Sequence, residues 1–253
     1  MKLTGGCATC AGNTRKVNQD AILYRLTQKK GQYFTVLAVC DGIGGLEKGE
    51  IASALVAHRI DEWFDRIVQW LDISGADPEV MYAHLKDAAE EWNLAVWEYR
   101  KNHGVRTGTT LSLLMILRDR YYTLHVGDSR IYLCGEKDWK QLTVDASVTQ
   151  MNNGRMKTYL DNYMGKSGEL WFTSSSGPVR DGDLFLVCSD GLYHHLLQED
   201  VRKIRRDGLD EKKAEAACRK LIEKMLERGE GDNISAGIVM AKRKRKWFEK
   251  RGV

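Results

Sequence analysis

The stretch VLAVCDGIGGLEKGE, residues 36–50, joins an apolar segment to a glycine-rich turn. Five apolar residues at 36–40 complete a strand-like run that begins at residue 32, and the run stops at Asp41. From residue 47 to 71 apolar side chains recur at helical spacing, which predicts an amphipathic helix after the turn. A buried carboxylate without a partner is costly, so Asp41 is predicted to hold a ligand. The glycines at 42, 44 and 45 give the backbone room for it.

The remaining pattern predicts an α+β fold with mostly antiparallel sheets. A second helix is expected from Pro78 to 102, before Gly104, and a third at 210–228. Strands are expected at 109–117, 121–126, 130–134, 183–188 and 234–241. Residues 145–168 look polar and irregular, with a turn signal at 152–154. Early helices, a run of hairpins and a late helix argue against alternating βαβ units.

Composition indicates one soluble globular domain at 1–241. The chain has 253 residues, of which 43% are hydrophobic and 29% charged. No apolar run approaches the ~18 residues of a membrane span. The first residues lack the apolar core of a signal peptide, so we expect a cytoplasmic protein. Six scattered cysteines suit reduced thiols, and the single CxxC of Cys7 and Cys10 leaves a zinc or redox role as a minor alternative.

The net charge of +4 is concentrated at the C-terminus. Residues 242–253, KRKRKWFEKRGV, hold seven Lys or Arg against one Glu, so the rest of the chain is slightly acidic. A basic tail can touch nucleic acid or an anionic surface, but such a run is more often a solvated end. We therefore expect no nucleic-acid partner.

Four aspartates are each expected at the end of an apolar strand and next to glycine: Asp41, Asp128, Asp190 and Asp232. Asp20, in VNQDA near the N-terminus, is added to this group. Each Asp-Gly alone is best explained as a plain turn. Their repetition predicts that strand ends gather these acids around hard divalent cations such as Mg²⁺ or Mn²⁺, which prefer oxygen ligands. The segment DGIGG lacks the Lys-Ser/Thr of a P-loop, and a bare aspartate would repel phosphate. A metal is therefore expected between this loop and any bound phosphate.

Seven segments, in order over nearly the whole chain, carry a family resemblance. They are GNTRKVNQDA, AVCDGIGGLEKGEIAS, TGTTLSLL, HVGDSRIYL, QLTVDAS, LFLVCSDGLYHHL and GDNISAGIV. Together they resemble the PPM-type (protein phosphatase 2C) metal-dependent protein serine/threonine phosphatases in their compact bacterial form. The resemblance implies a four-layer αββα sandwich, two antiparallel β-sheets flanked by helices, with a metal centre at one edge.

The resemblance also implies roles for individual residues. Asp41 would bridge two Mn²⁺ or Mg²⁺ ions, with the carbonyl of Gly42 as a further ligand. Asp190 and Asp232 would hold the second ion, Asp20 would contribute through water, and Arg15 would grip the substrate phosphate. Water or hydroxide between the ions would hydrolyse phosphoserine or phosphothreonine directly. The expected partners are phosphorylated proteins and a cognate serine/threonine kinase, and the enzyme is expected to be a monomer.

Four positions depart from the family pattern. Ile43 stands where many relatives have a histidine proposed as general acid, Gln19 replaces a glutamate, and Ala146 replaces a histidine. His194 replaces an acid that helps Asp128 to hold a third metal. Since imidazole suits Mn²⁺ better than Mg²⁺, a weak or manganese-selective third site is predicted. The plain alternative is that His194 and His195 lie on a solvated helix start, and that Arg15 is a surface arginine.

Two other classes of function remain open from the residues. One is a phosphatase dedicated to a single regulatory partner, such as an anti-sigma-factor antagonist. The other is a binding module that keeps the fold without metals, although all the core ligands are present.

Overall fold

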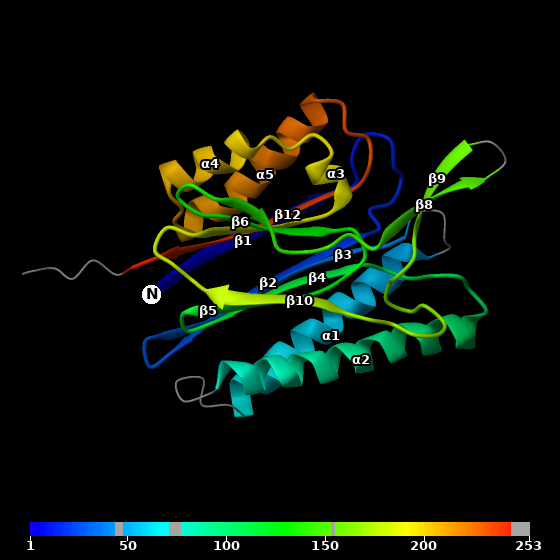
Figure 1. Cartoon of the computed structure of the whole chain (residues 1–253), viewed down its shortest axis with the longest axis horizontal. Coiled ribbons are helices and arrows are strands. Elements are labelled where there is room, and N and C mark those ends of the chain that lie inside the picture. The colour runs from blue at the N-terminus through cyan, green and yellow to red at the C-terminus, as the bar shows by residue number, and fades with distance from the viewer. Residues whose placement is uncertain (44–47, 71–76, 153–154, 244–253) are drawn as a thin grey trace, which may run out of the picture.

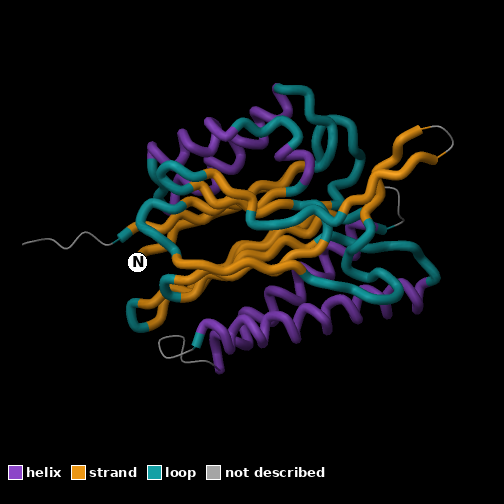
Figure 2. The backbone as a smooth tube through the Cα atoms, in the orientation of Figure 1, coloured by secondary structure: helices purple, strands orange, loops and turns teal. Residues whose placement is uncertain are grey.

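The computed structural model describes residues 1–43, 48–70, 77–152 and 155–243, which fold into four layers. Two five-stranded antiparallel sheets lie face to face, and helices cover the outer side of each (Figure 1). Figure 2 shows the same layers, with the strands in the middle and the helices on both outsides. The α+β sandwich predicted from the sequence is confirmed.

The first sheet has the strand order β10-β5-β4-β3-β2, and the two long helices cover its outer face. Its strands are β2 (Asp20–Lys29), β3 (Gln32–Asp41), β4 (Leu111–Leu117), β5 (Arg120–Val126) and β10 (Thr173–Pro178). Helices α1 (Gly49–Trp70) and α2 (Pro78–His103) pack on its outer face. The side chain of Asp77 caps α2 by accepting a hydrogen bond from the Glu79 amide at 2.9 Å, and Gly104 ends the helix with φ 63°.

The second sheet has the order β1-β12-β11-β6-β7. Its strands are β1 (Lys2–Cys10), β6 (Arg130–Cys134), β7 (Trp139–Gln141), β11 (Leu184–Cys188) and β12 (Ile234–Lys242). Helices α3 (Asp190–Tyr193), α4 (Gln198–Asp207) and α5 (Glu211–Glu227) cover it. The last strand reaches Lys242, and residues 244–253 of the predicted basic tail lie outside the described part of the chain.

Three apolar clusters fill the three spaces between the layers. Strand β3 shows the arrangement because it is buried on both faces: Phe34 and Val36 belong to the cluster under α1 and α2, whereas Leu37 and Val39 belong to the cluster between the sheets. The third cluster lies between β12 and α5 and includes Ile238. A strand buried on both sides explains why the run at 32–40 is almost continuously apolar.

The structure corrects the prediction that residues 145–168 are irregular. Strands β8 (Ser147–Asn152) and β9 (Arg155–Leu160) form an antiparallel hairpin that projects from one end of the sandwich (Figure 1). Val148, Met151 and Tyr159 are exposed large hydrophobic side chains of this hairpin. In its register Asn152 pairs with Arg155, and residues 153–154 of the predicted turn signal lie outside the described part of the chain.

Several elements were not predicted, notably β1, β2, β7, β10, α3 and α4. Strand β1 contains two consecutive glycines, Gly5 and Gly6. Both are glycine because of close packing: a Cβ at Gly5 would lie 2.5 Å from the carbonyl oxygen of Ile238. Among the described residues, no helix has the length and apolar character needed to span a membrane. All six cysteines are described and are free thiols.

Candidate active site

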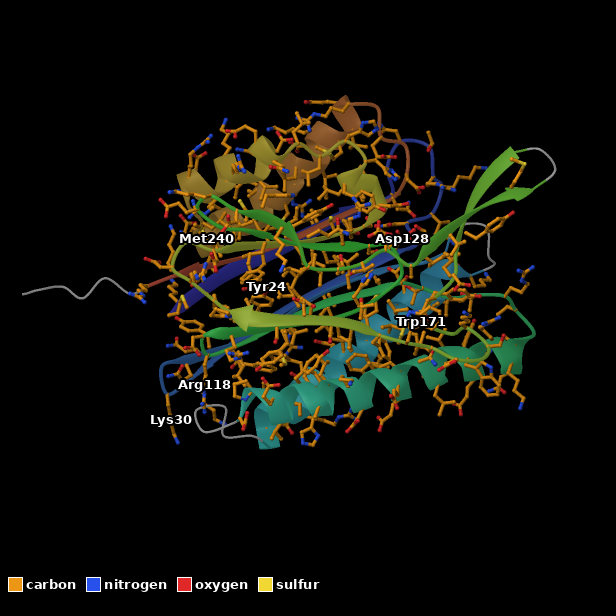
Figure 3. The ribbon with its side chains drawn as sticks, in the orientation of Figure 1. Tyr24, Lys30, Arg118, Asp128, Trp171 and Met240 are labelled. Carbon is orange, nitrogen blue, oxygen red and sulfur yellow. The ribbon has the colours of Figure 1, made fainter. Side chains whose placement is uncertain are left out.

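Five aspartates gather at one end of the sandwich because neighbouring strands run antiparallel. Asp41 ends β3, Asp128 follows β5, and Asp190 follows β11. Asp20 begins β2 and Asp232 precedes β12, so the expectation that Asp232 ends a strand was wrong. In an antiparallel pair the start of one strand lies beside the end of the next, which brings all five to the same edge. Figure 3 shows Asp128 at the end opposite to Lys30 and Arg118, which lie by the turns at the far ends of the strands.

Asp20 and Asp41 face each other directly in the register of β2 and β3. The side chain of Asp20 is buried; its Oδ2 accepts a hydrogen bond from the Ser235 hydroxyl at 2.7 Å, whereas its Oδ1 has no hydrogen-bond partner among the described residues. Burial raises the pKa of Asp20 to about 7, and the nearby Asp190 and Asp232 add to the increase. Burial and the charge of Asp20 likewise raise the pKa of Asp41 well above its usual range.

Asp190 and Asp128 extend the same acidic cluster. Asp190 is the first residue of α3, and burial together with Asp232 raises its pKa. Asp128 lies in the turn between β5 and β6, where burial and the charge of Asp190 raise its pKa to about 6. Each carboxylate therefore destabilises the ionised form of its neighbours.

These residues fit hard divalent cations. The donors are oxygens, one buried carboxylate oxygen of Asp20 is unpartnered, and the mutual repulsion would be relieved by positive charge. Within the described ranges, no three Asp, Glu, His or Cys side chains converge as a closed set of metal ligands. An open arrangement suits Mg²⁺ or Mn²⁺, which keep several water ligands and need only one or two carboxylates each.

Gly42 has no room for any side chain. A Cβ there would lie 2.5 Å from the carbonyl group of Gly49 and 2.6 Å from the carbonyl oxygen of Gln19. The Gly42 amide donates to that Gln19 oxygen at 3.0 Å, which fastens the end of β3 to the residue before Asp20. The predicted contribution of Gly44 and Gly45 to the turn lies outside the described residues.

The segment TGTT at 107–110 fixes the main chain of Asp41. The amide of Asp41 donates to the Thr110 hydroxyl at 2.9 Å, and its carbonyl oxygen accepts from the Thr110 amide at 2.8 Å. The hydroxyl of Thr109 donates to the same carbonyl at 2.9 Å. Asp41 therefore has little backbone freedom, as a residue that presents its carboxylate to a ligand requires.

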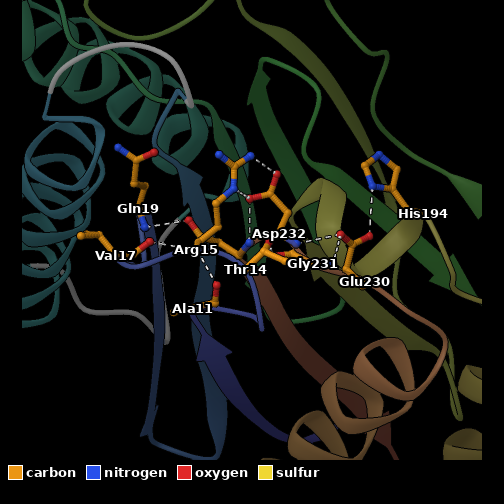
Figure 4. A network of polar contacts seen from close by, with 10 residues as sticks. Ala11, Thr14, Arg15, Val17, Gln19, His194, Glu230, Gly231 and Asp232 are labelled. Carbon is orange, nitrogen blue, oxygen red and sulfur yellow. Dashed lines mark hydrogen bonds and ion pairs between the residues drawn. The ribbon is translucent and has the colours of Figure 1, made fainter.

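Arg15 lies at the site, where its guanidinium forms a bidentate ion pair with Asp232 (Figure 4). Its Nε is 2.8 Å from Oδ1 and its Nη2 is 2.7 Å from Oδ2. Asn233 orders the loop that carries Arg15, because its amide nitrogen donates to the carbonyls of Ala11 and Val17 at 2.9 and 3.1 Å. The arginine is therefore placed beside one of the candidate metal ligands, with half of its side chain exposed.

The departures from the family pattern acquire partners that the sequence did not reveal. The side chain of Gln19 lies 3.4 Å from a carboxylate oxygen of Glu50, on α1. His194 directs Nδ1 toward Glu230 Oε2 at 3.3 Å. The charged residues that affect the pKa of Asp128 include Asp190, Asp145 and Arg130. Neither Glu50 nor Glu230 was singled out from the sequence, because the acid lies far along the chain from the residue it contacts.

A buried histidine supports the loop of Asp128. His125 Nε2 lies 3.1 Å from the carbonyl oxygens of Gly127 and Val144, so this nitrogen carries the hydrogen, and Nδ1 accepts from the Ser112 hydroxyl at 2.9 Å. Burial lowers the pKa of His125 to about 4, although the backbone carbonyls and Asp145 partly oppose the shift. The neutral imidazole thus ties the turn after β5 to the segment that leads into β8.

This arrangement predicts an acid-sensitive contribution to stability. The unfolded chain binds a proton at His125 below about pH 6.5, and the folded chain only below about pH 4, so stability is lost as the pH falls between these values. The full contribution is about 3 kcal/mol at 1.36 kcal/mol for each pKa unit. We expect the difference in unfolding free energy between wild type and His125→Gln, measured by urea denaturation in EDTA, to shrink by about this amount from pH 7 to pH 4. A difference independent of pH would contradict this assignment.

The chain is similar in sequence to known protein phosphatases. The serine/threonine protein phosphatase PstP of Mycobacterium tuberculosis is 28% identical over 217 residues, which cover 80% of this chain and 40% of PstP. The protein phosphatase PhpP of Streptococcus pneumoniae is 26% identical over 209 residues, covering 78% of this chain and 81% of PhpP.

Solved structures share the fold. PppA, a key regulatory component of T6SS in Pseudomonas aeruginosa, is 25% identical and superimposes with a TM-score of 0.73 over 94% of this chain and 97% of its own. The catalytic domain of PstP in complex with two manganese ions is 24% identical, with a TM-score of 0.73 over 95% and 99% of the two chains. The family model for protein phosphatase 2C matches residues 12–241. The chain therefore belongs to the protein phosphatase 2C family, and the prediction of a phosphoprotein phosphatase is confirmed.

Proposed function

We propose that the chain is a metal-dependent serine/threonine phosphatase that hydrolyses phosphoserine and phosphothreonine in proteins without a covalent phosphoenzyme. The observation that carries this proposal is the pairing of Asp20 with Asp41 at the end of the first sheet, with one buried carboxylate oxygen unpartnered. Two acids so placed need cations between them. The names of PstP and PhpP and the manganese complex of PstP support the same chemistry.

In this proposal the aspartates have different roles in binding two Mn²⁺ or Mg²⁺ ions. Asp41 would serve both ions, the carbonyl of Gly42 would be a further ligand of one of them, and Asp190 and Asp232 would hold the other. Asp20 would contribute through water, and Asp128 would belong to a third and weaker site. When bound, the two cations lower the pKa of water between them and offset the negative charge of the phosphate.

Arg15 has the geometry to hold the phosphate. A guanidinium offers two parallel donors, which match two phosphate oxygens as well as they match the two oxygens of Asp232 in the structure. Ile43, within the DGIGG segment, has no proton to give, so the leaving Ser or Thr oxygen takes its proton from water or from another residue. We infer that the enzyme acts as a cytoplasmic monomer on phosphorylated proteins and opposes a cognate kinase; the six free cysteines suit a reducing compartment.

Peptide dephosphorylation tests this proposal. The purified protein should release phosphate from phosphoserine and phosphothreonine peptides in the presence of Mn²⁺, and much more slowly from the matching phosphotyrosine peptide. EDTA should abolish the release, and added Mn²⁺ should restore it. Asp190→Asn should remove the activity, whereas Asp87→Asn, on the exposed side of α2, should leave it unchanged. Phosphate release that survives EDTA, or equal activity of Asp190→Asn, would contradict the proposal.

A further inference from the structure

Glu230 has a buried side chain beside the candidate metal ligands, and the proposed reaction gives it no role. Only 8% of the residue is exposed. Its Oε1 accepts hydrogen bonds from the backbone amides of Gly231 and Asp232 at 2.8 and 2.9 Å. Its Oε2 lies 3.3 Å from His194 Nδ1 (Figure 4) and 3.8 Å from His195 Nε2. One carboxylate thus contacts two separate segments of the chain.

Each of these segments carries a candidate metal ligand. Asp232 receives the contact at its own amide. Asp190 opens α3, and the amide of His194, one turn later, donates to the carbonyl of Asp190 at 3.1 Å. Because a carboxylate only accepts hydrogen bonds, Nδ1 of His194 must carry a hydrogen, and the two segments are held from one central acid. Glu230 therefore links the backbone positions of Asp190 and Asp232.

The surroundings fix Glu230 itself. Its amide donates to the carbonyl of Met225 at 3.0 Å, at the end of α5. Arg228, two residues earlier, donates to the carbonyl of His195 at 2.7 Å and to Asp200 at 2.6 Å. Burial would raise the pKa of Asp200, but the hydrogen bonds from Arg228 and Lys224 outweigh it and lower the pKa to about 2. The end of α5 is thus fastened to the turn after α3, so Glu230 is held on a rigid base.

We propose that Glu230 is a positioning residue that sets the spacing of Asp190 and Asp232 and thereby the affinity of the site for a divalent cation. This inference rests on the proposed function, because it assumes that both aspartates hold metal. The chemistry requires an acceptor oxygen at Oε1 for two amides and a polar contact at Oε2 for His194. Loss of such an outer contact commonly weakens metal binding by about 10–100-fold.

Calorimetric titration of the metal-free protein with MnCl₂ tests this role. Glu230→Ala should bind Mn²⁺ at least about 10-fold more weakly than wild type. Glu230→Gln should stay close to wild type, because its amide oxygen still accepts from both backbone amides and its amide nitrogen can donate to His194 in the other tautomer. Glu223→Ala, which removes an exposed acid from the same end of α5, is the matched control and should bind as wild type does.

The outcomes separate this inference from the proposed function. A wild-type protein that binds no Mn²⁺ contradicts the proposed function. A wild-type protein that binds, with Glu230→Ala equal to it, overturns only the role of Glu230, as does Glu230→Gln falling as far as alanine. If circular dichroism shows that Glu230→Ala is unfolded, His194→Ala removes the same contact from the side of His194, whose side chain is half-exposed. That variant should also bind Mn²⁺ more weakly, and an unchanged affinity would overturn the inference.

Discussion

Replacing Asp41 with asparagine is expected to lower kcat for phosphopeptide hydrolysis by about 10³-fold or more, while the metal-free protein becomes slightly more stable. The activity falls because the ions lose a carboxylate proposed to bind both of them. The transition state then loses several kcal/mol of charge stabilisation. The stability rises because Asp41 faces Asp20 directly, and like charges in a cross-strand pair repel.

Two measurements on the same preparations check this pair of effects. Removing repulsion of about 1 kcal/mol should raise the unfolding midpoint in EDTA by about 2–4 °C. Asp87→Asn, which removes an exposed charge from α2, should change neither kcat nor the unfolding midpoint. An Asp41→Asn protein with wild-type turnover would refute the role of Asp41. A metal-free variant that melts lower than wild type would refute the electrostatic account of the pair.

Arg15→Ala is expected to lower kcat/KM by about 10²-fold, since two charge-assisted hydrogen bonds to phosphate are lost. Arg15→Lys should recover only part of this loss, because an ammonium cannot match two oxygens in parallel. In the absence of phosphate, Arg15→Ala should bind Mn²⁺ more tightly than wild type. The reason is that Arg15 occupies both carboxylate oxygens of Asp232, and a cation must compete for them.

Steady-state kinetics and calorimetry separate these two consequences. Arg59→Ala, which removes an exposed arginine on α1 that pairs with Glu62 on the same helix, serves as the control. Full activity of Arg15→Ala would exclude a phosphate role. A loss of activity together with weaker Mn²⁺ binding would mean that Arg15 supports the site rather than competing for it.

The sequence predicted those features that depend on local pattern. The apolar run ending at Asp41 gave β3, the proline and glycine at 78 and 104 bounded α2, and the repeated strand-end aspartates indicated an acidic site. These features depend on residues within a few positions of one another, so spacing alone reveals them.

What the sequence could not predict depends on pairing between distant segments. Gly5 belongs to a strand through the pairing of β1 with β12, and the carbonyl of Ile238 leaves no room for a Cβ there. Strand β10 (Thr173–Pro178) has few apolar residues and lies at the edge of its sheet. Arg15 pairs with Asp232, which is 217 positions away. In the sequence Glu230 resembles an ordinary surface acid, and only the fold shows that it contacts His194. Such contacts depend on tertiary packing, which overrides local propensity.

The most direct test of the central claim is the anomalous scattering of manganese in crystals grown with MnCl₂ from protein that hydrolyses phosphoserine peptides. We expect manganese beside the carboxylates of Asp41, Asp190 and Asp232, and the loss of these peaks together with the activity in Asp41→Asn. Manganese found only elsewhere in the molecule, or full activity in crystals and solutions that bind none, would contradict it.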